Sequence, residues 1–165
     1  MADIGELAKS RMESVDKVLD EYELSVGLPT YQESKNVEEM DEYLNMGRQE
    51  LEALTQEACE EIACRLIQFA FHMQRAQNRE TSRASWARNE LEMTIAGELN
   101  NYEGYGYKEK APQAIKGNAY ASKVNKIMIY AEQREKRLAF LSRSLNSLAD
   151  VLKNSKRNKW RENAN

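Results

Sequence analysis

The sequence predicts an all-α protein, a long helical hairpin with a coiled-coil-like seam and a short N-terminal helix, and we expect it to oligomerise. Three observations support this fold class. The 165 residues include only 2 Pro and 7 Gly, 31% of the residues are charged, and apolar residues recur at helical spacing along most of the chain. One helix-rich domain therefore fits better than a multidomain enzyme.

An acidic N-terminal helix and a linker are predicted over residues 1–36. Apolar residues from Ile4 to Tyr22 recur every three or four positions, which is the stripe of an amphipathic helix. The stretch from Ser25 to Asn36 lacks this period and contains a glycine and a proline. It is therefore predicted to be the linker.

The helical hairpin is predicted over residues 37–154. Its first arm extends from about Val37 to Asn100, either as one very long helix or as two helices joined by a break. The weakest point is the almost wholly polar stretch 74–85, although no Gly or Pro demands a turn there. A loop is predicted over Asn100–Gln113, where two glycines and Pro112 lie.

The second arm carries an apolar repeat. Residues recur every seven positions with a second row three positions later, which is the a/d pattern of a coiled coil. The first arm can fill this seam, yet two helices bury little surface, so we expect a homo-oligomer. The predicted seam and oligomerisation residues are Val124, Ile127, Ala131, Leu138, Leu141, Leu145, Leu148 and Leu152.

Charge is divided unevenly along the chain. Residues 1–64 hold 17 Asp and Glu against 5 Lys and Arg, whereas residues 65–165 hold 10 against 19, so the net charge of -3 averages an acidic front and a basic back. The back ends in a predicted basic, flexible tail over residues 155–165. A basic part suggests a polyanionic partner; the alternative is that both parts are solvated helix faces.

No catalytic residue, cofactor or metal site is expected. The single histidine, His72, lies in an apolar stretch and fits a packed residue better than a base or ligand. Cys59 and Cys64 are five apart in a helical pattern, a spacing that suits neither a disulfide framework nor a metal site. No phosphate-cradling glycine motif is present. The sequence therefore predicts a protein that is not an enzyme.

Tyrosines and lysines are interleaved around the predicted loop, and Lys123 and Lys126 follow. Cations neutralise phosphates while tyrosine rings stack on unpaired bases, the combination that binds single-stranded nucleic acid. A second basic series begins with arginines at four-residue spacing on one helix face. The alternative is that the tyrosines pack on helix ends and the cations only solvate the helices. The predicted nucleic-acid-binding residues are Arg79, Arg83, Arg88, Tyr105, Tyr107, Lys108, Lys110 and Lys116.

From about Asn89 to Arg157 the chain resembles the UvsY-type recombination mediators of tailed bacteriophages. The resemblance rests on the loop and the heptad helix after it, and on the residues Leu99, Asn100, Tyr102, Gly104 and Gly106. It implies a ring-like homo-oligomer, for example a heptamer, that binds single-stranded DNA. Such proteins help a RecA-like recombinase to displace the single-strand-binding protein, an accessory role in DNA recombination, repair and replication without nucleotide hydrolysis.

The sequence also departs from that family. The basic pair that precedes the loop in the family aligns with Ala96 and Glu98, so those DNA contacts are not carried over. Two other functions stay open: an oligomeric helical scaffold or assembly chaperone, and a packaging adaptor that binds duplex DNA. No apolar run reaches the roughly 18 residues of a membrane span, and the N-terminus lacks the layout of a signal peptide. We therefore expect a cytoplasmic protein without membrane contact, in the host cytoplasm if it is phage-encoded.

Overall fold

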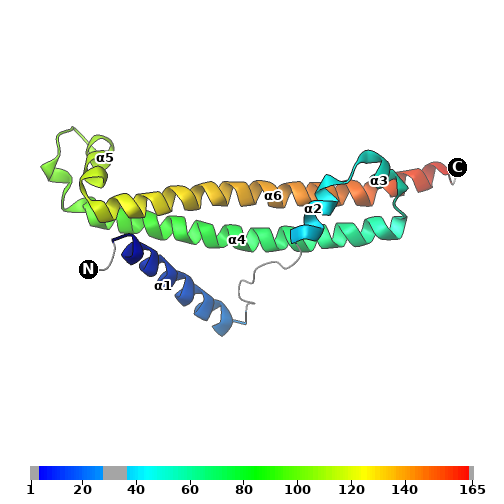
Figure 1. Ribbon diagram of the computed structural model, residues 1–165, viewed down its shortest axis with the longest axis horizontal. Helices are drawn as coiled ribbons and strands as arrows, with labels where there is room; N and C mark the ends of the chain where they lie inside the picture. Colours follow the sequence, from blue (N-terminus) through cyan, green and yellow to red (C-terminus); the bar gives the residue numbers. More distant parts are fainter. Residues whose placement is uncertain (1–3, 28–36, 164–165) are drawn as a thin grey trace. The chain divides into compact units, whose positions relative to one another are not determined.

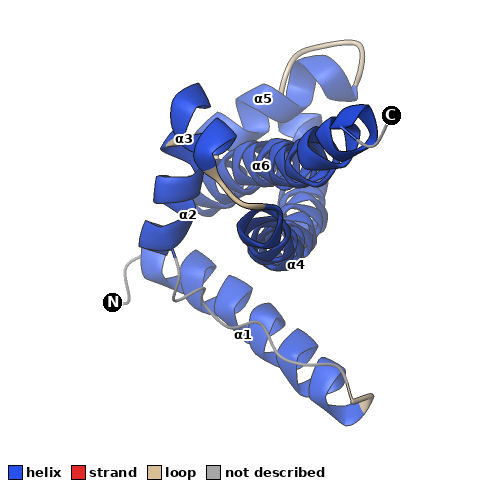
Figure 2. Ribbon diagram, turned by 90° about the vertical axis from the view of Figure 1, so that its right-hand side faces the viewer, coloured by secondary structure: helices blue, strands red, loops and turns tan. Residues whose placement is uncertain are grey.

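The computed structural model describes residues 4–27 and 37–163, and within them every regular element is helical (Figures 1 and 2). Helix α4 packs against α6 in a hairpin, which confirms the predicted fold class. Side chains are described up to Asn154. The elements are α1 (Ile4–Ser25), α2 (Val37–Asn45), α3 (Arg48–Ala53), α4 (Gln56–Ala96), a 3-10 turn (Leu99–Asn101), α5 (Tyr107–Gly117) and α6 (Ala119–Asn163).

The chain divides into two compact units. The first unit comprises Met1–Tyr31 and Gln77–Lys136, and the second comprises Gln32–Ala76 and Arg137–Asn165. Helices α4 and α6 each contribute one part to either unit. Each unit therefore combines segments that are far apart in the sequence.

Polar side chains set the starts of three helices. Gly47 precedes α3 and its N–H donates to Glu50 Oε2 at 2.7 Å. Thr55 Oγ1 accepts the N–H of Ala58 at 3.2 Å ahead of α4. Asn118 Oδ1 accepts the N–H of Ala121 at 2.9 Å ahead of α6. Each contact satisfies a backbone donor that the first helical turn leaves without a partner.

The second unit has a core of aliphatic side chains and alanines. Leu66 on α4 and Leu145 on α6 are almost fully buried, and Met40 of α2 joins them. Ala63 and Ala149 are fully buried in the same cluster, where their small side chains let helices approach closely. The packing brings Ser142 Oγ within 3.1 Å of the Ala70 carbonyl, to which it donates.

The first unit is built around alanines. Ile95 and Val124 are its largest fully buried residues, and α1 contributes Ala8, which is fully buried as well. Along α1 the described side chains at positions 7, 18, 22 and 24 are exposed although they are apolar. Helix α1 is thus attached through few apolar contacts, and polar contacts carry much of its attachment.

Most of the predicted seam is buried within the single chain. Val124 and Ala131 are fully buried in the single chain, and Leu145 and Leu152 are 2% and 4% exposed. Ile127, Leu138 and Leu148 are partly buried, and Leu141 alone of the eight is exposed, at 42%. The chain's own helices therefore fill much of the seam, as expected for a hairpin, and the role of these residues in oligomerisation stays a prediction.

Several predicted boundaries differ from the structure. The polar stretch 74–85 lies in an unbroken α4, where Glu80 and Ala84 are buried; the breaks instead flank α3. Pro112 lies inside α5, so the predicted loop narrows to the residues between the 3-10 turn and Tyr107. Residues 28–36 of the predicted linker and the side chains of the predicted tail lie outside the described residues, while the α6 backbone is helical to Asn163.

Candidate nucleic-acid interface

The connection between α4 and α6 forms a tip with a defined shape. Gly104 has φ +145°, and a Cβ there would lie 2.9 Å from Glu109 Cβ, so glycine suits this position. The Tyr105 N–H donates to Glu109 Oε2 at 3.0 Å. Gln113 Nε2 donates to the carbonyls of Glu103 and Glu109, both at 3.0 Å. Side-chain contacts with the backbone thus hold the tip together.

The tip tyrosines divide into an inner one and two outer ones. Tyr102 packs against the core of the first unit, and its hydroxyl lies so close to Gly117 that a Cβ on Gly117 would overlap it. Tyr105 is fully exposed and Tyr107 is 51% exposed. The aromatic faces of Tyr105 and Tyr107 are therefore accessible, whereas Tyr102 serves packing.

The tip lysines keep their charges available. Lys108 and Lys116 are exposed and Lys110 is partly buried, and none of the three forms an ion pair with any residue that the structure describes. Two nearby carboxylates are engaged elsewhere: Glu98 accepts from Asn118 Nδ2 at 2.9 Å and Glu109 from the Tyr105 backbone. The tyrosine–lysine tip, defined as Tyr105, Tyr107, Lys108, Lys110 and Lys116, thus presents aromatic faces and cations together.

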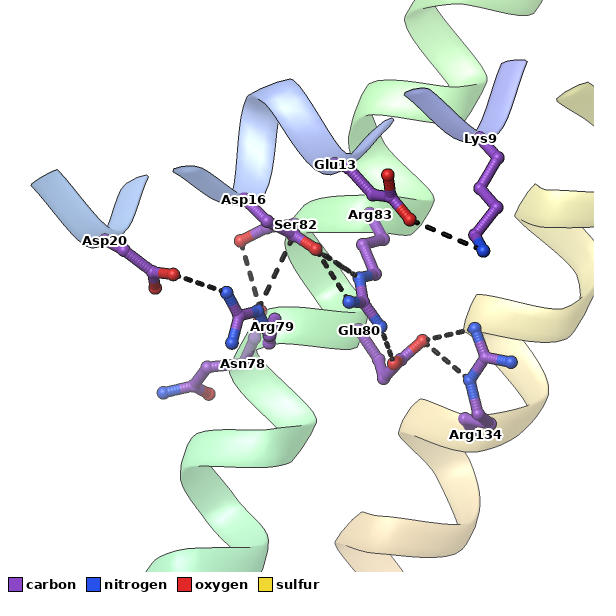
Figure 3. A network of polar contacts seen from close by, with 10 residues as sticks. All are labelled: Lys9, Glu13, Asp16, Asp20, Asn78, Arg79, Glu80, Ser82, Arg83 and Arg134. Atoms are coloured by element: carbon purple, nitrogen blue, oxygen red, sulfur yellow. Dashed lines mark hydrogen bonds and ion pairs between the residues drawn. The ribbon is translucent and has the colours of Figure 1, made fainter. Parts of the chain in front are cut away.

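The predicted arginines have a different environment. Arg79 Nη2 lies 2.7 Å from Asp20 Oδ2, and Arg83 Nη2 lies 2.6 Å from Asp16 Oδ2 (Figure 3). Arg83 also donates to Glu80 Oε1 at 2.6 Å. Helix α1 therefore places its aspartates on the α4 arginines.

This network is largely withdrawn from solvent. Asp16 and Glu80 are each only 7% exposed, and Arg134 of α6 also pairs with Glu80 at 2.8 Å. Burial alone would lower the pKa of Arg83, but its hydrogen bonds and charge interactions with Asp16 and Glu80 outweigh burial and raise it. The Arg83 guanidinium is fully charged, and its charge is balanced within the chain.

Arg88 lies at the exposed end of the same series. Its Nη2 is 2.7 Å from Glu132 Oε1, and its side chain is 58% exposed. The arginine row, defined as Arg79, Arg83 and Arg88, is thus paired with carboxylates at every position.

His72, Cys59 and Cys64 are the other residues that the sequence offered as possible catalytic or metal-binding groups. The His72 ring stacks on Phe69 with centroids 6.1 Å apart, and burial followed by the nearby Arg75 charge lowers its pKa. Cys59 is buried, whereas Cys64 is exposed. Within the described ranges, no three His, Cys, Asp or Glu side chains gather as a metal site would require. No described helix combines the length and apolarity that a membrane span needs.

Known proteins give no further guide. Comparison with protein families, curated proteins and solved structures found no match.

The sequence reasoning missed two members of a further basic surface. Tyr130 and Arg134 lie on α6 beyond Lys123 and Lys126, and the structure brings all four to one groove with Lys9 of α1. The signal was available in the spacing, since residues 123, 127, 130 and 134 recur at helical intervals. The spacing could not show that α1 lies beside these α6 residues.

Proposed function

We propose that this protein binds single-stranded DNA at its tyrosine–lysine tip and acts as an accessory mediator that helps a RecA-like recombinase to replace single-strand-binding protein. One observation carries the DNA-binding part: Tyr105 and Tyr107 point outward beside lysines that have no carboxylate partner among the described residues. The recombinase-loading part rests on the resemblance of residues 89–157 to phage recombination mediators.

The chemistry of the tip favours single strands over duplex. A tyrosine ring stacks on an unpaired base with about 1–3 kcal/mol per base, which a paired base inside a duplex does not allow. The lysines add a salt-dependent attraction to phosphates that is independent of sequence. Tyr105 is fully exposed, so its ring is available to stack on an unpaired base.

The test is binding of a fluorescent oligonucleotide, followed by anisotropy at several salt concentrations. The triple variant Lys108→Gln, Lys110→Gln, Lys116→Gln removes three cations, so the slope of log affinity against log salt falls by about 2, at roughly 0.7 per phosphate. The matched control changes the exposed lysines Lys17, Lys136 and Lys153 to Gln and keeps the slope. Absence of single-strand binding, or a preference for duplex, contradicts the proposal.

Recombinase loading needs its own measurement. With strands covered by single-strand-binding protein, the wild-type protein shortens the lag before a RecA-like filament forms, and the tip triple variant does not. An unchanged lag with the wild-type protein would leave a strand-binding protein without the mediator role.

A further inference from the structure

A groove lies between α1 and α6 within the first unit. Its volume is about 320 Å³. Helix α1 lines it with Gly5, Lys9 and Met12. Helix α6 lines it with Lys123, Lys126, Ile127, Tyr130 and Arg134. Every charged side chain among the described residues of its lining is a cation.

Two of the four cations are uncommitted. Lys9 lies 3.6 Å from Glu13, and Arg134 pairs with Glu80. Lys123 and Lys126 are exposed and form no ion pair within the part of the chain that the structure describes. The attraction of the groove for an anion therefore comes first from Lys123 and Lys126.

The aromatic side chain lies among these cations. Lys123, Tyr130 and Arg134 share one face of α6, because they are separated by seven and four residues. They span about 16 Å at 1.5 Å per residue. Tyr130 is 60% exposed and Ile127 is partly buried, so the groove combines an open ring with an apolar floor. Cations that flank an accessible ring suit alternating phosphates and bases.

We propose that this groove is a second contact site for a DNA single strand, in which Lys123 and Lys126 hold phosphates and Tyr130 stacks on a base. The inference rests on the proposed function and extends it from the tip to the α1–α6 side of the same unit. An acidic peptide would satisfy the lysines but would leave the exposed ring of Tyr130 unused, so a nucleic acid fits the whole lining better.

The first test removes the two free cations in the full chain. The double variant Lys123→Gln, Lys126→Gln is expected to lower the salt slope of oligonucleotide binding by about 1.4, at roughly 0.7 per phosphate. The matched control, Lys136→Gln with Lys153→Gln, alters exposed lysines of the same helix that do not line the groove and leaves the slope unchanged.

The second test addresses stacking. Tyr130→Ala is expected to weaken single-strand binding about 5- to 150-fold, which corresponds to 1–3 kcal/mol per stacked base, whereas Tyr130→Trp retains the affinity. Tyr22→Ala, at a similarly exposed tyrosine of α1, serves as the control. Photo-crosslinking with an iodouracil oligonucleotide is expected to label Tyr130 directly.

The outcomes separate this inference from the proposed function. If the tip triple variant weakens binding while the groove variants and the crosslink show nothing, the groove site is wrong and the proposed function stands. If the wild-type chain binds no single strand, both fail. The inference is overturned if a polyglutamate peptide binds the wild-type chain but not the Lys123→Gln, Lys126→Gln variant, while both chains bind the oligonucleotide equally. The groove would then be a site for an acidic peptide.

Discussion

The arginine row and the tyrosine–lysine tip both place cations in the first unit, but the two sets of cations differ in their ion-pair partners. Arg79 and Arg83 pair with aspartates of α1, in a network whose Asp16 and Glu80 are almost buried. The tip lysines have no such partner in the described part of the chain. A cluster of basic residues in the sequence can therefore belong to an internal ion-pair network or form an open cationic surface.

The difference lies in which acidic residues come near. Helix α1 belongs to the acidic front of the sequence, and folding brings its Asp16 and Asp20 onto the basic back. Part of the charge separation that the sequence displays is thus neutralised inside the molecule. What stays available for a polyanion is the portion of the basic back that α1 does not cover.

The largest expected effect comes from breaking the network at Asp16. Asp16→Ala removes the carboxylate that accepts from Arg83 and leaves that guanidinium with Glu80 alone. We expect a loss of about 2–3 kcal/mol in unfolding free energy, less than the roughly 3–5 of a fully buried pair, because Arg83 keeps Glu80. Urea unfolding measures the loss, and amide exchange along α1 shows whether this helix detaches first.

Glu13→Ala is the matched control for Asp16→Ala. Glu13 lies on the same helix and pairs with Lys9, but its side chain is 57% exposed, so its removal should change stability by about 0.5 kcal/mol or less. Equal stability of the two variants would show that the arginine row does not hold α1.

The helical hairpin could be predicted because its pattern is local. The seven-residue repeat from Val124 to Leu152 needs only the helix period, and the structure buries most of that repeat. Its partner could not be predicted in the same way, since a stripe is equally well covered by the same chain or by a copy of it. The alanines at positions 8, 63, 70 and 149, which are fully buried or nearly so, give a weak apolar signal although they allow close packing within the chain.

The next largest effect is expected where Tyr102, the inner tyrosine of the tip, packs against Gly117. Gly117→Ala places a Cβ against the Tyr102 hydroxyl, and we expect a loss of about 1–2 kcal/mol from overpacking. Tyr102→Phe in the same chain removes the clashing oxygen and should restore part of the loss. Thermal unfolding measures both variants.

Gly97→Ala is the control for that cycle, because no atom lies within 4 Å of its added Cβ. It should stay within about 0.5 kcal/mol of the wild type. If Gly117→Ala behaves like Gly97→Ala, Tyr102 is free to move and the assignment of one inner and two outer tyrosines is wrong.

The candidate site could be predicted only in part from the sequence, because tertiary contacts decide which of its side chains face outward. The order of Tyr102, Tyr105 and Tyr107 does not show which ring turns inward, since that depends on the close approach to Gly117. The arginine spacing likewise shows a shared helix face but not the aspartates that a helix some 60 residues away places on it. Local periodicity predicts faces, whereas tertiary contacts decide whether a face is open.

The smallest expected effect falls on Arg88, which is paired with a carboxylate although its side chain is 58% exposed. Its pair with Glu132 is short, but both side chains are partly or largely exposed. Arg88→Gln should therefore cost about 0.5 kcal/mol of unfolding free energy and change single-strand affinity less than about twofold. Glu132→Gln provides the converse test, because it releases Arg88 without removing it. If the arginine row is internal throughout, neither variant alters the salt slope; if Arg88 belongs to the open surface, Arg88→Gln lowers the slope by about 0.7 and Glu132→Gln tightens binding.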